Sequence, residues 1–368
     1  MSKLLIIMFF LGILGVYVFA HYLIFKDIIL IFSVESIKLK IFIGIFIAFS
    51  GLSFFIYELS LKFFRLGFLQ YYSSVWMGFI TLSFVFFILI WVWDLIGLPY
   101  DRVFGFFTLF LVLILMIISV KNGLKLPEVK KIEIVYKDLP PALDGYKIVH
   151  LSDLHLGSVK ARGWSKKLVK IVDSLNPDLI LITGDLIDRG AGHIREDFYE
   201  LKRLKAKDGI YAITGNHEFY SNYNLFLRLT DETKINKISN NCVKINDNLE
   251  VLGMDDPELR AFLKNDVKLE DIIKNCSDNG FKIFLYHRPE KFEKAVNLGI
   301  NLQLSGHTHN GQIFPINFIV SAVYKYHYGL FKFKNSYIYT TSGVSTWGPP
   351  MRLFSENELP LIVLRRGG

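Results

Sequence analysis

The pattern of hydrophobic positions divides the chain into two parts of different character. The first third carries four continuous apolar runs that contain no Asp, Glu, Lys or Arg, at residues 4–25, 41–57, 74–93 and 103–120. Runs of roughly 17–25 apolar residues are long enough to cross a bilayer as helices. The sequence therefore predicts an N-terminal all-α transmembrane anchor of four helices over residues 1–125, followed by a second domain over residues 126–368.

Details of the apolar runs refine this anchor. The run at 4–25 is longer than the apolar core of a signal peptide and has no clear small-x-small cleavage site, so we expect it to be retained as a helix. Residues 58–73 fit either a short interfacial helix or an extension of a neighbouring span. Because ion and proton pathways usually need charged groups at membrane depth, the charge-free runs favour an anchor over a channel or transporter.

The distribution of basic residues predicts the orientation of the anchor. Four spans place both of its ends on one side of the membrane, the side of Lys3, Lys62, Arg65, Lys121, Lys125, Lys130 and Lys131. The opposite side carries Lys26, Lys38, Lys40 and Arg102. Lys and Arg are enriched in cytoplasmic loops. We therefore expect a multi-pass protein of the cell membrane whose second domain is cytoplasmic.

From residue 126 onward, short apolar runs alternate with amphipathic segments. The expected strands are residues 131–136, 146–151, 178–182, 209–213, 249–253, 281–285, 302–304 and 336–340. The expected helices are residues 165–175, 196–204, 221–229, 269–276 and 289–298. Such alternation is typical of an α/β domain. Residues 314–339, rich in Phe, Tyr and Ile, fit either a core hairpin or a membrane-facing surface that admits acyl chains.

Composition narrows the classes of function. The chain is 52% hydrophobic, too apolar for a wholly soluble enzyme. Its net charge of +8 divides evenly, with nine Lys/Arg against five Asp/Glu before residue 126 and 33 against 29 after it. Neither part is basic enough to indicate nucleic-acid binding. The two cysteines, Cys242 and Cys276, are too few for a disulfide framework or a thiolate metal site and fit a reducing compartment.

Metal-ligand residues follow five of the expected strands. They are Asp153 and His155, then Asp185 with Asp188 and Arg189 just beyond, then Asn216 and His217, then His287, and finally His307 and His309. The carboxyl ends of strands form the ligand-binding edge of α/β proteins. A donor set of Asp, His and Asn without Cys suits Mn²⁺, Fe or Zn²⁺ better than Ca²⁺.

These motifs together resemble the calcineurin-like metallophosphoesterase superfamily. The resemblance rests on Asp153-x-His155, Gly184-Asp185-x-x-Asp188, Gly215-Asn216-His217-Glu218, His287 and Gly306-His307-x-His309. Residues 139–141, 253–257, 286–290, 342–344 and 348–353 look like the bacterial membrane-associated branch. The resemblance implies a sandwich of two mixed β-sheets flanked by helices, with two divalent metal ions (Mn, Fe or Zn) at the strand ends.

The resemblance also assigns roles to individual residues. Asp153, His155 and His309 would bind the first metal. Asn216, His287 and His307 would bind the second, and Asp185 would bridge both. His217 would protonate the leaving oxygen and Asp188 would orient it, although Asp188 could instead cap a helical turn. Arg189 and Arg352 are candidates for binding phosphate, with surface ion pairing as the alternative.

The resulting hypothesis is a membrane-anchored, metal-dependent phosphoesterase that hydrolyses phosphodiester or pyrophosphate bonds. Its expected partners are a phosphoester substrate and membrane lipid, with no nucleic acid. Because some membrane-associated relatives cleave UDP-diacylglucosamine, a lipid-linked substrate of that kind is the most specific expectation. The alternatives are a phosphodiesterase for soluble nucleotides with an incidental anchor and a non-catalytic membrane scaffold.

Overall fold

The computed structural model divides the chain into two compact units. The first unit is Met1–Lys121 with Pro349–Leu353, and the second is Asn122–Gly348 with Phe354–Gly368. The residues that the structure describes are 3–61, 63, 66–97, 102–161, 163–189, 194–277 and 279–367.

Among the described residues, four helices of the first unit are long and apolar enough to cross a membrane. They are α1 (Lys3–Ile31), α2 (Ile37–Ser60), α3 (Gly67–Leu95) and α4 (Arg102–Gly123). Residues 58–60 belong to α2 and residues 67–73 to α3, so most of segment 58–73 extends the neighbouring spans; Lys62 and Arg65 lie outside the described residues. Because α1 continues to Ile31, Lys26 and Asp27 join this helix, and only its central run is free of charge.

A polar cluster connects α1, α2 and α3. The Trp76 Nε1–H donates a hydrogen bond to His21 Nε2 at 3.1 Å, and His21 Nδ1 lies 2.8 Å from the Tyr17 carbonyl. The Tyr17 hydroxyl donates to the Gly51 carbonyl at 2.7 Å. These polar atoms therefore satisfy one another, as is required where water is absent.

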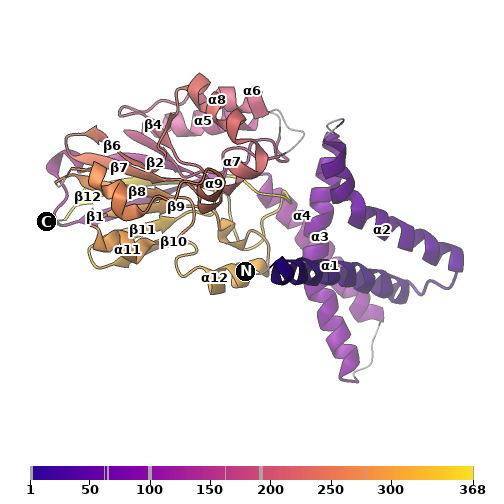
Figure 1. Cartoon of the computed structure of the whole chain (residues 1–368). Helices are drawn as coiled ribbons and strands as arrows, with labels where there is room; N and C mark the ends of the chain where they lie inside the picture. Colours follow the sequence, from indigo (N-terminus) through magenta and orange to yellow (C-terminus); the bar gives the residue numbers. More distant parts are fainter. Residues whose placement is uncertain are drawn as a thin grey trace. The chain divides into compact units, whose positions relative to one another are not determined.

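The second unit contains two six-stranded mixed sheets (Figure 1). The first has the order β1 (Glu128–Tyr136), β12 (Glu358–Arg366), β2 (Lys147–Leu151), β3 (Leu179–Ile182), β4 (Ile210–Ala212) and β5 (Asn236–Lys237). The second has the order β10 (Gly329–Phe333), β11 (Ser336–Thr340), β9 (Leu302–Ser305), β8 (Phe281–Tyr286), β7 (Leu249–Met254) and β6 (Asn241–Asn246). The expected α/β class with two mixed sheets is confirmed.

Side-chain alternation along the strands explains why the sheets stack. Successive side chains of a strand point to opposite faces. In β3, Leu179 and Leu181 enter the core between the two sheets, while Ile180 and Ile182 pack towards the helices outside. Strand β8 follows the same rule, with Ile283 in the inner core and Phe284 in the outer one. Both sheets are therefore covered on both faces.

Short helices cover the outer faces of the sandwich and form its connections (Figure 1). They are α5 (Trp164–Ser174), α6 (Ile194–Leu201), α7 (Asn216–Ser221), α8 (Tyr223–Thr233), α9 (Pro257–Phe262), α10 (Leu269–Ile272), α11 (Phe292–Asn297) and α12 (Ile316–Val323), with 3₁₀ turns η1 (Pro141–Leu143), η2 (Ile273–Asn275) and η3 (His309–Gly311). The region 314–339 contains both an exposed helix, α12, and the β10–β11 hairpin.

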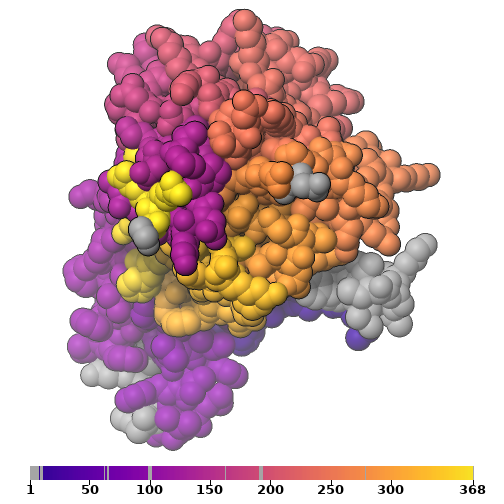
Figure 2. Space-filling view, turned by 90° about the vertical axis from the view of Figure 1, so that its left-hand side faces the viewer, coloured from indigo at the N-terminus to yellow at the C-terminus, as the bar shows by residue number. Residues whose placement is uncertain are grey.

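Strand β12 was not among the expected strands, yet it lies within the first sheet. It pairs in parallel with β1 from Glu128↔Glu358 onward and antiparallel with β2 over Leu361↔Val149 to Val363↔Lys147. Figure 2 shows the yellow C-terminal segment beside the purple segment that precedes β2. Pro360 masks this strand in the sequence, because proline is rare within sheets; here it precedes the stretch that pairs with β2.

The interpretation that the two cysteines fit a reducing compartment is not supported by this structure. Cys242 on β6 and Cys276 after η2 form a disulfide with a Cα–Cα distance of 5.5 Å. The two residues are 34 positions apart and come together only because β6 and η2 pack side by side. A count of cysteines cannot reveal this proximity, and the cysteines no longer indicate a reducing compartment.

Candidate metal centre

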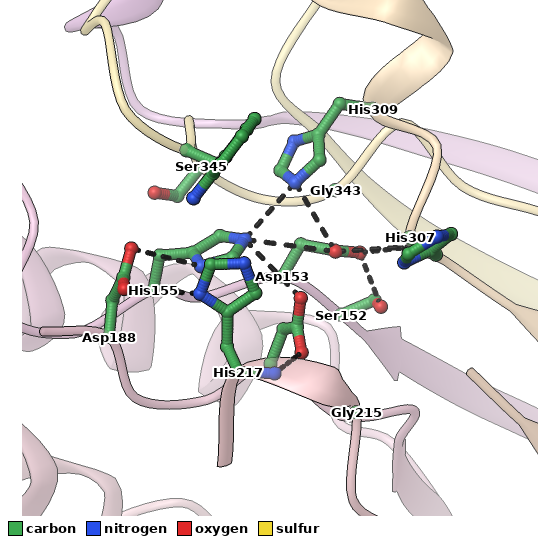
Figure 3. Close-up of polar contacts among 12 residues, drawn as sticks. Ser152, Asp153, His155, Asp188, Gly215, His217, His307, His309, Gly343 and Ser345 are labelled. Carbon is green, nitrogen blue, oxygen red and sulfur yellow. Dashed lines mark hydrogen bonds and ion pairs between the residues drawn. The ribbon is translucent and has the colours of Figure 1, made fainter. Parts of the chain in front are cut away.

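The five ligand-bearing loops meet because their strands run in the same direction. Strands β2, β3 and β4 are parallel neighbours in the first sheet, and β8 and β9 are parallel neighbours in the second. The carboxyl ends of parallel strands lie at one edge of a sheet, and stacking brings the two edges together. This is where the loops place their carboxylates and imidazoles (Figure 3).

The first cluster joins Asp153, His155 and His309, all of them buried (Figure 3). The Nε2 atoms of the two histidines are 3.1 Å apart, and His309 Nε2 lies 3.3 Å from Asp153 Oδ1. Burial alone would raise the pKa of Asp153, but the neighbouring histidines, His309 foremost, hold that pKa well below its ordinary value. An ionised carboxylate and two ring nitrogens thus point at one position.

The second cluster joins Asp185, His287 and His307. His287 Nε2 lies 3.2 Å from Asp185 Oδ2 and 3.3 Å from His307 Nδ1. Asn216, the first residue of α7, contributes a buried Oδ1 that has no hydrogen-bond partner within the described part of the chain. A buried amide oxygen without a partner is costly unless something else binds it.

Asp185 lies between the two clusters. Its Oδ2 is 3.2 Å from His287 Nε2 in the second cluster and 3.7 Å from His155 Nε2 in the first. Burial alone would raise the pKa of Asp185, but His287 and the other histidines keep that pKa far below its ordinary value. One ionised oxygen therefore faces both groups of ring nitrogens.

The donor set fits two divalent metal ions. Pairs of imidazole nitrogens face each other at 3.1 and 3.3 Å, a spacing at which lone pairs repel unless a proton or a cation lies between them. Carboxylate oxygens and the unpaired Asn216 Oδ1 complete the set. Oxygen and imidazole donors without sulfur suit Mn²⁺, Fe or Zn²⁺.

His217 and Asp188 form a pair beside this centre (Figure 3). His217 Nδ1 lies 3.1 Å from Asp188 Oδ1, and the His217 backbone N–H donates to Asp185 Oδ1 at 2.9 Å. Burial disfavours protonation of His217, but the charge of Asp185 and the hydrogen bond to Asp188 outweigh it and raise the pKa to about 9. The ring can therefore hold a proton on the nitrogen that faces away from Asp188.

Asp188 has a second contact that the sequence did not indicate. Its Oδ2 lies 3.5 Å from Nδ1 of His155, so the same carboxylate faces the rings of two histidines. Helix α6 begins at Ile194, and residues 190–193 lie outside the described residues, so the alternative that Asp188 caps a helical turn stays open. Asp188 thus faces Nδ1 of both rings, and a carboxylate in this position is suited to leave Nε2 free to bind a metal.

Glu218 is a structural residue of the centre that sequence reasoning did not identify as such. Its fully buried carboxylate accepts four backbone N–H bonds, from Gly215, Asp185, Leu186 and Ile187, at 2.6 to 3.2 Å. These bonds fix the Asp185 loop against the start of α7. Gly215 lies in the same contact, since a Cβ there would be 2.1 Å from Asp185 Oδ1.

Tyr324 and Thr183 orient ring nitrogens in the second cluster. The Tyr324 hydroxyl lies 3.2 Å from His307 Nε2, which leaves Nδ1 facing His287. The Thr183 carbonyl lies 2.7 Å from His287 Nδ1, so that nitrogen carries the proton and Nε2 faces Asp185. Hydrogen bonds of this kind fix the tautomers of metal-binding histidines. Neither residue has a spacing in the sequence that would reveal its role.

Two aromatic side chains flank His217. Tyr220 and Trp347 have ring centroids 5.6 and 5.7 Å from the imidazole. Trp347 is 51% exposed, and the Gln312 side chain holds its backbone through two hydrogen bonds of 2.8 and 2.9 Å. An exposed ring held in a fixed position is suited to contact a substrate.

The two arginine candidates lie in different surroundings. The Arg189 Nε donates to the Tyr220 carbonyl, which places this exposed guanidinium beside α7. Arg352 is fully buried and belongs to the segment Pro349–Leu353 that groups with the helical unit, where its backbone N–H donates to the Ser119 carbonyl. Phosphate binding by either arginine stays a prediction.

Sequence comparisons agree with this geometry. Residues 146–311 match the family profile described as calcineurin-like phosphoesterase. Similar proteins include "Transmembrane protein with metallophosphoesterase domain" from Danio rerio, 31% identical over 69% of this chain and 61% of that protein, and from Bos taurus, 32% identical over 68% and 60%. A metallophosphoesterase from Campylobacter jejuni is 31% identical over 67% of this chain and 66% of its own length. The chain thus spans about three fifths of the length of the vertebrate relatives.

Proposed function

Given that this chain belongs to the calcineurin-like phosphoesterase family through residues 146–311, we propose that it is a metal-dependent phosphoesterase held in a membrane by its four helices. The observation that carries the proposal is the position of Asp185, whose Oδ2 faces His155 Nε2 at 3.7 Å and His287 Nε2 at 3.2 Å. A carboxylate shared by two clusters is what a dinuclear centre requires.

Each predicted ligand has a place in this proposal. Asp153, His155 and His309 would hold the first metal, Asn216, His287 and His307 would hold the second, and Asp185 would serve both. Two such ions supply Lewis-acid chemistry that polarises a phosphoryl group and activates water for in-line attack.

His217 and Asp188 supply the proton chemistry. With Asp188 on Nδ1, the protonated His217 presents Nε2–H towards the side of the centre where a leaving oxygen departs. Proton donation to that oxygen avoids the release of a high-energy alkoxide. Trp347 and Tyr220 flank His217.

The substrate that we propose is a phosphodiester or pyrophosphate with a lipid-linked part, such as UDP-diacylglucosamine. The four candidate spans support it, because they would anchor the chain in a membrane that can contain such a lipid. A second candidate is a soluble nucleotide diester. The exposed Trp347 ring beside His217 favours it, since a nucleobase can stack on such a ring.

The orientation of the α/β domain is part of the proposal. The seven-to-four distribution of Lys and Arg supports a cytoplasmic domain. The Cys242–Cys276 disulfide supports the opposite, because such bonds are typical of proteins outside the cytoplasm. A reporter fused after residue 368 distinguishes the two: alkaline phosphatase activity, which requires export, would overturn the cytoplasmic orientation.

The test of catalysis uses the full chain in detergent, stripped of metal and reloaded with Mn²⁺, Fe²⁺ or Zn²⁺. The substrates are bis-p-nitrophenyl phosphate, p-nitrophenyl phosphate and UDP-diacylglucosamine. We expect metal-dependent hydrolysis of the diester in preference to the monoester. Absence of hydrolysis of every substrate with both metals bound would favour the non-catalytic scaffold.

Two variants separate the proton donor from the ligands. We expect His217→Ala to lower kcat by about 10²–10⁴-fold with metal content unchanged, as for the loss of a general acid. Asp188→Asn should lower kcat and also weaken the first metal, because Asp188 faces both His217 and His155. Unchanged kcat in His217→Ala would assign the proton transfer to another group.

A further inference from the structure

Helix α12 exposes apolar side chains that no part of the α/β core covers. Ile316, Phe318, Ile319 and Val323 lie on its surface, with Phe318 63% and Val323 67% exposed. None of the eight residues of α12 is buried. From Asn310 to Tyr324 the sequence contains no Asp, Glu, Lys or Arg. Surfaces that face water are normally about a quarter or more charged, so this segment is unusual.

Comparison with helix α5 shows how the other surface helices behave. Helix α5 buries Leu168, Val169 and Val172 against the first sheet and carries lysines on its outer side. Its apolar residues are therefore part of the core. Those of α12 are not, although the helix has a similar number of them. Figure 1 shows α12 outside both sheets of the domain.

The apolar surface continues beyond the helix. The Phe314 ring lies 5.8 Å from that of Phe318 and 5.8 Å from that of Phe354, which is 70% exposed. We use the term apolar surface for Phe314, Ile316, Phe318, Ile319, Val323 and Phe354. A contiguous surface of this kind indicates an interaction site rather than scattered exposure.

One polar side chain of the helix is satisfied within the helix itself. The exposed Ser321 hydroxyl donates to the Phe318 carbonyl at 2.9 Å, within the helix itself. Such a bond is compatible with apolar surroundings but does not require them, because the exposed Ser174 of α5 makes the same bond. The charge-free run ends at Lys325, whose side chain is 72% exposed and forms an ion pair with Glu293 at 2.7 Å. Long basic side chains at the border of an apolar surface reach the headgroups of a bilayer.

We propose that the apolar surface enters the interface of the bilayer in which the chain's own helices are anchored. The four spans restrict the α/β domain to the neighbourhood of a membrane, so lipid is the apolar phase always within reach. A helix with apolar side chains around it and a basic residue at its end fits the boundary between headgroups and acyl chains.

The apolar surface borders the metal centre at two points. Ser355, next to Phe354, donates its hydroxyl to the His309 carbonyl at 2.7 Å. Tyr324, the residue after α12, lies 3.2 Å from His307 Nε2. A phosphoester with acyl chains in the membrane would therefore meet the centre at the edge of this surface. This step rests on the proposed function and names its substrate class as lipid-anchored phosphoesters.

Photo-crosslinking of the full chain tests the membrane contact without any assay of activity. Phe318 is replaced by p-benzoylphenylalanine, and the chain is reconstituted in vesicles of phosphatidylethanolamine and phosphatidylglycerol. We expect phospholipid adducts at position 318 by mass spectrometry. The matched control is Phe262 on α9, 62% exposed but close to Glu258, Arg260 and Lys264, where we expect no lipid adduct. Crosslinks from position 318 to this chain or to a second copy, in place of lipid, would overturn the proposal.

A double variant tests the substrate class separately. Phe318→Asp with Ile319→Asp should raise KM for vesicle-bound UDP-diacylglucosamine at least tenfold and leave hydrolysis of bis-p-nitrophenyl phosphate unchanged. Equal KM for the lipid substrate would overturn its delivery through this surface. Failure of the wild-type chain to hydrolyse any substrate would overturn the proposed function instead, and lipid adducts at position 318 would then still support the membrane contact.

Discussion

The helical unit and the α/β domain use the same kinds of side chain in opposite ways. The helical unit turns Phe, Ile and Leu outward and satisfies His21, Tyr17 and Trp76 with one another inside. The α/β domain buries its aliphatic residues between layers and gathers its polar groups at strand ends. The difference teaches that an exposed apolar side chain is unfavourable in water but favourable in lipid. The exposed apolar residues of α12 are therefore unusual for a domain in water and normal for a helix in contact with a membrane.

A single substitution in the polar centre of the α/β domain should have the largest effect of those proposed here. Asp185→Asn removes the one carboxylate that faces both histidine clusters. We expect the metal affinity of both sites to fall by more than about 100-fold, which is more than the loss of an outer hydrogen bond causes. Metal per chain is measured by mass spectrometry after dialysis. Loss of one ion with the other retained would show that Asp185 does not bridge.

Glu218 tests whether the strand-end loops depend for stability on one buried carboxyl group that accepts four backbone hydrogen bonds. Glu218→Gln replaces an acceptor by an NH₂ group that faces backbone N–H donors. We expect a loss of about 3 kcal/mol in free energy of unfolding, and a fall in melting temperature of roughly 6–12 °C. The control is Asp247→Asn, whose side chain is 93% exposed and which should leave the melting temperature unchanged. Equal melting temperatures for the two variants would show that Glu218 does not stabilise the fold.

Tyr324 sharpens the comparison at the point where the metal centre meets α12. Tyr324→Phe removes the partner of His307 Nε2 and frees the ring to rotate or change tautomer. We expect metal affinity to fall about 10–100-fold, measured by titration of the stripped full chain. The matched control is Tyr326→Phe, whose hydroxyl bonds Glu293 and should leave metal binding unchanged. A similar loss in both variants would indicate general loosening of the segment.

The smallest expected effect is in the helical unit. Trp76→Phe leaves His21 Nε2 without its donor, and hydrogen bonds between membrane helices contribute about 0.6 kcal/mol on average. Unfolding of the full chain by detergent titration measures the difference, with the outward-facing Trp93→Phe as control. A loss above about 2 kcal/mol in the free energy of unfolding would show that the Trp76–His21 contact contributes more than an average hydrogen bond between membrane helices.

Features that depend on a local pattern of residues can be predicted from the sequence. The apolar runs predict the four long helices, and Asp or His directly after a buried strand predicts the edge where Asp153, Asp185 and His287 meet, because parallel strands share one direction. The sequence does not predict Glu218 or Tyr324 as supports, since their partners are backbone amides and a ring that only the folded loops bring near. The Cys242–Cys276 pair is hidden for the same reason. Pro360 conceals β12, and the apolar residues of α12 resemble a core segment until their exposure is known.

The place of β12 has a consequence for the order in which the protein is made. On the ribosome, all four apolar helices and the ligand-bearing loops emerge before β12 does. Yet β1 has its only described strand partner in β12, and β2 has β12 on one side. The first sheet therefore cannot be completed during synthesis until residues 358–366 have emerged, because β12 lies between β1 and β2. A premature stop before Glu358 would leave an inserted protein whose β1 has no sheet to join, a natural substrate for membrane quality control.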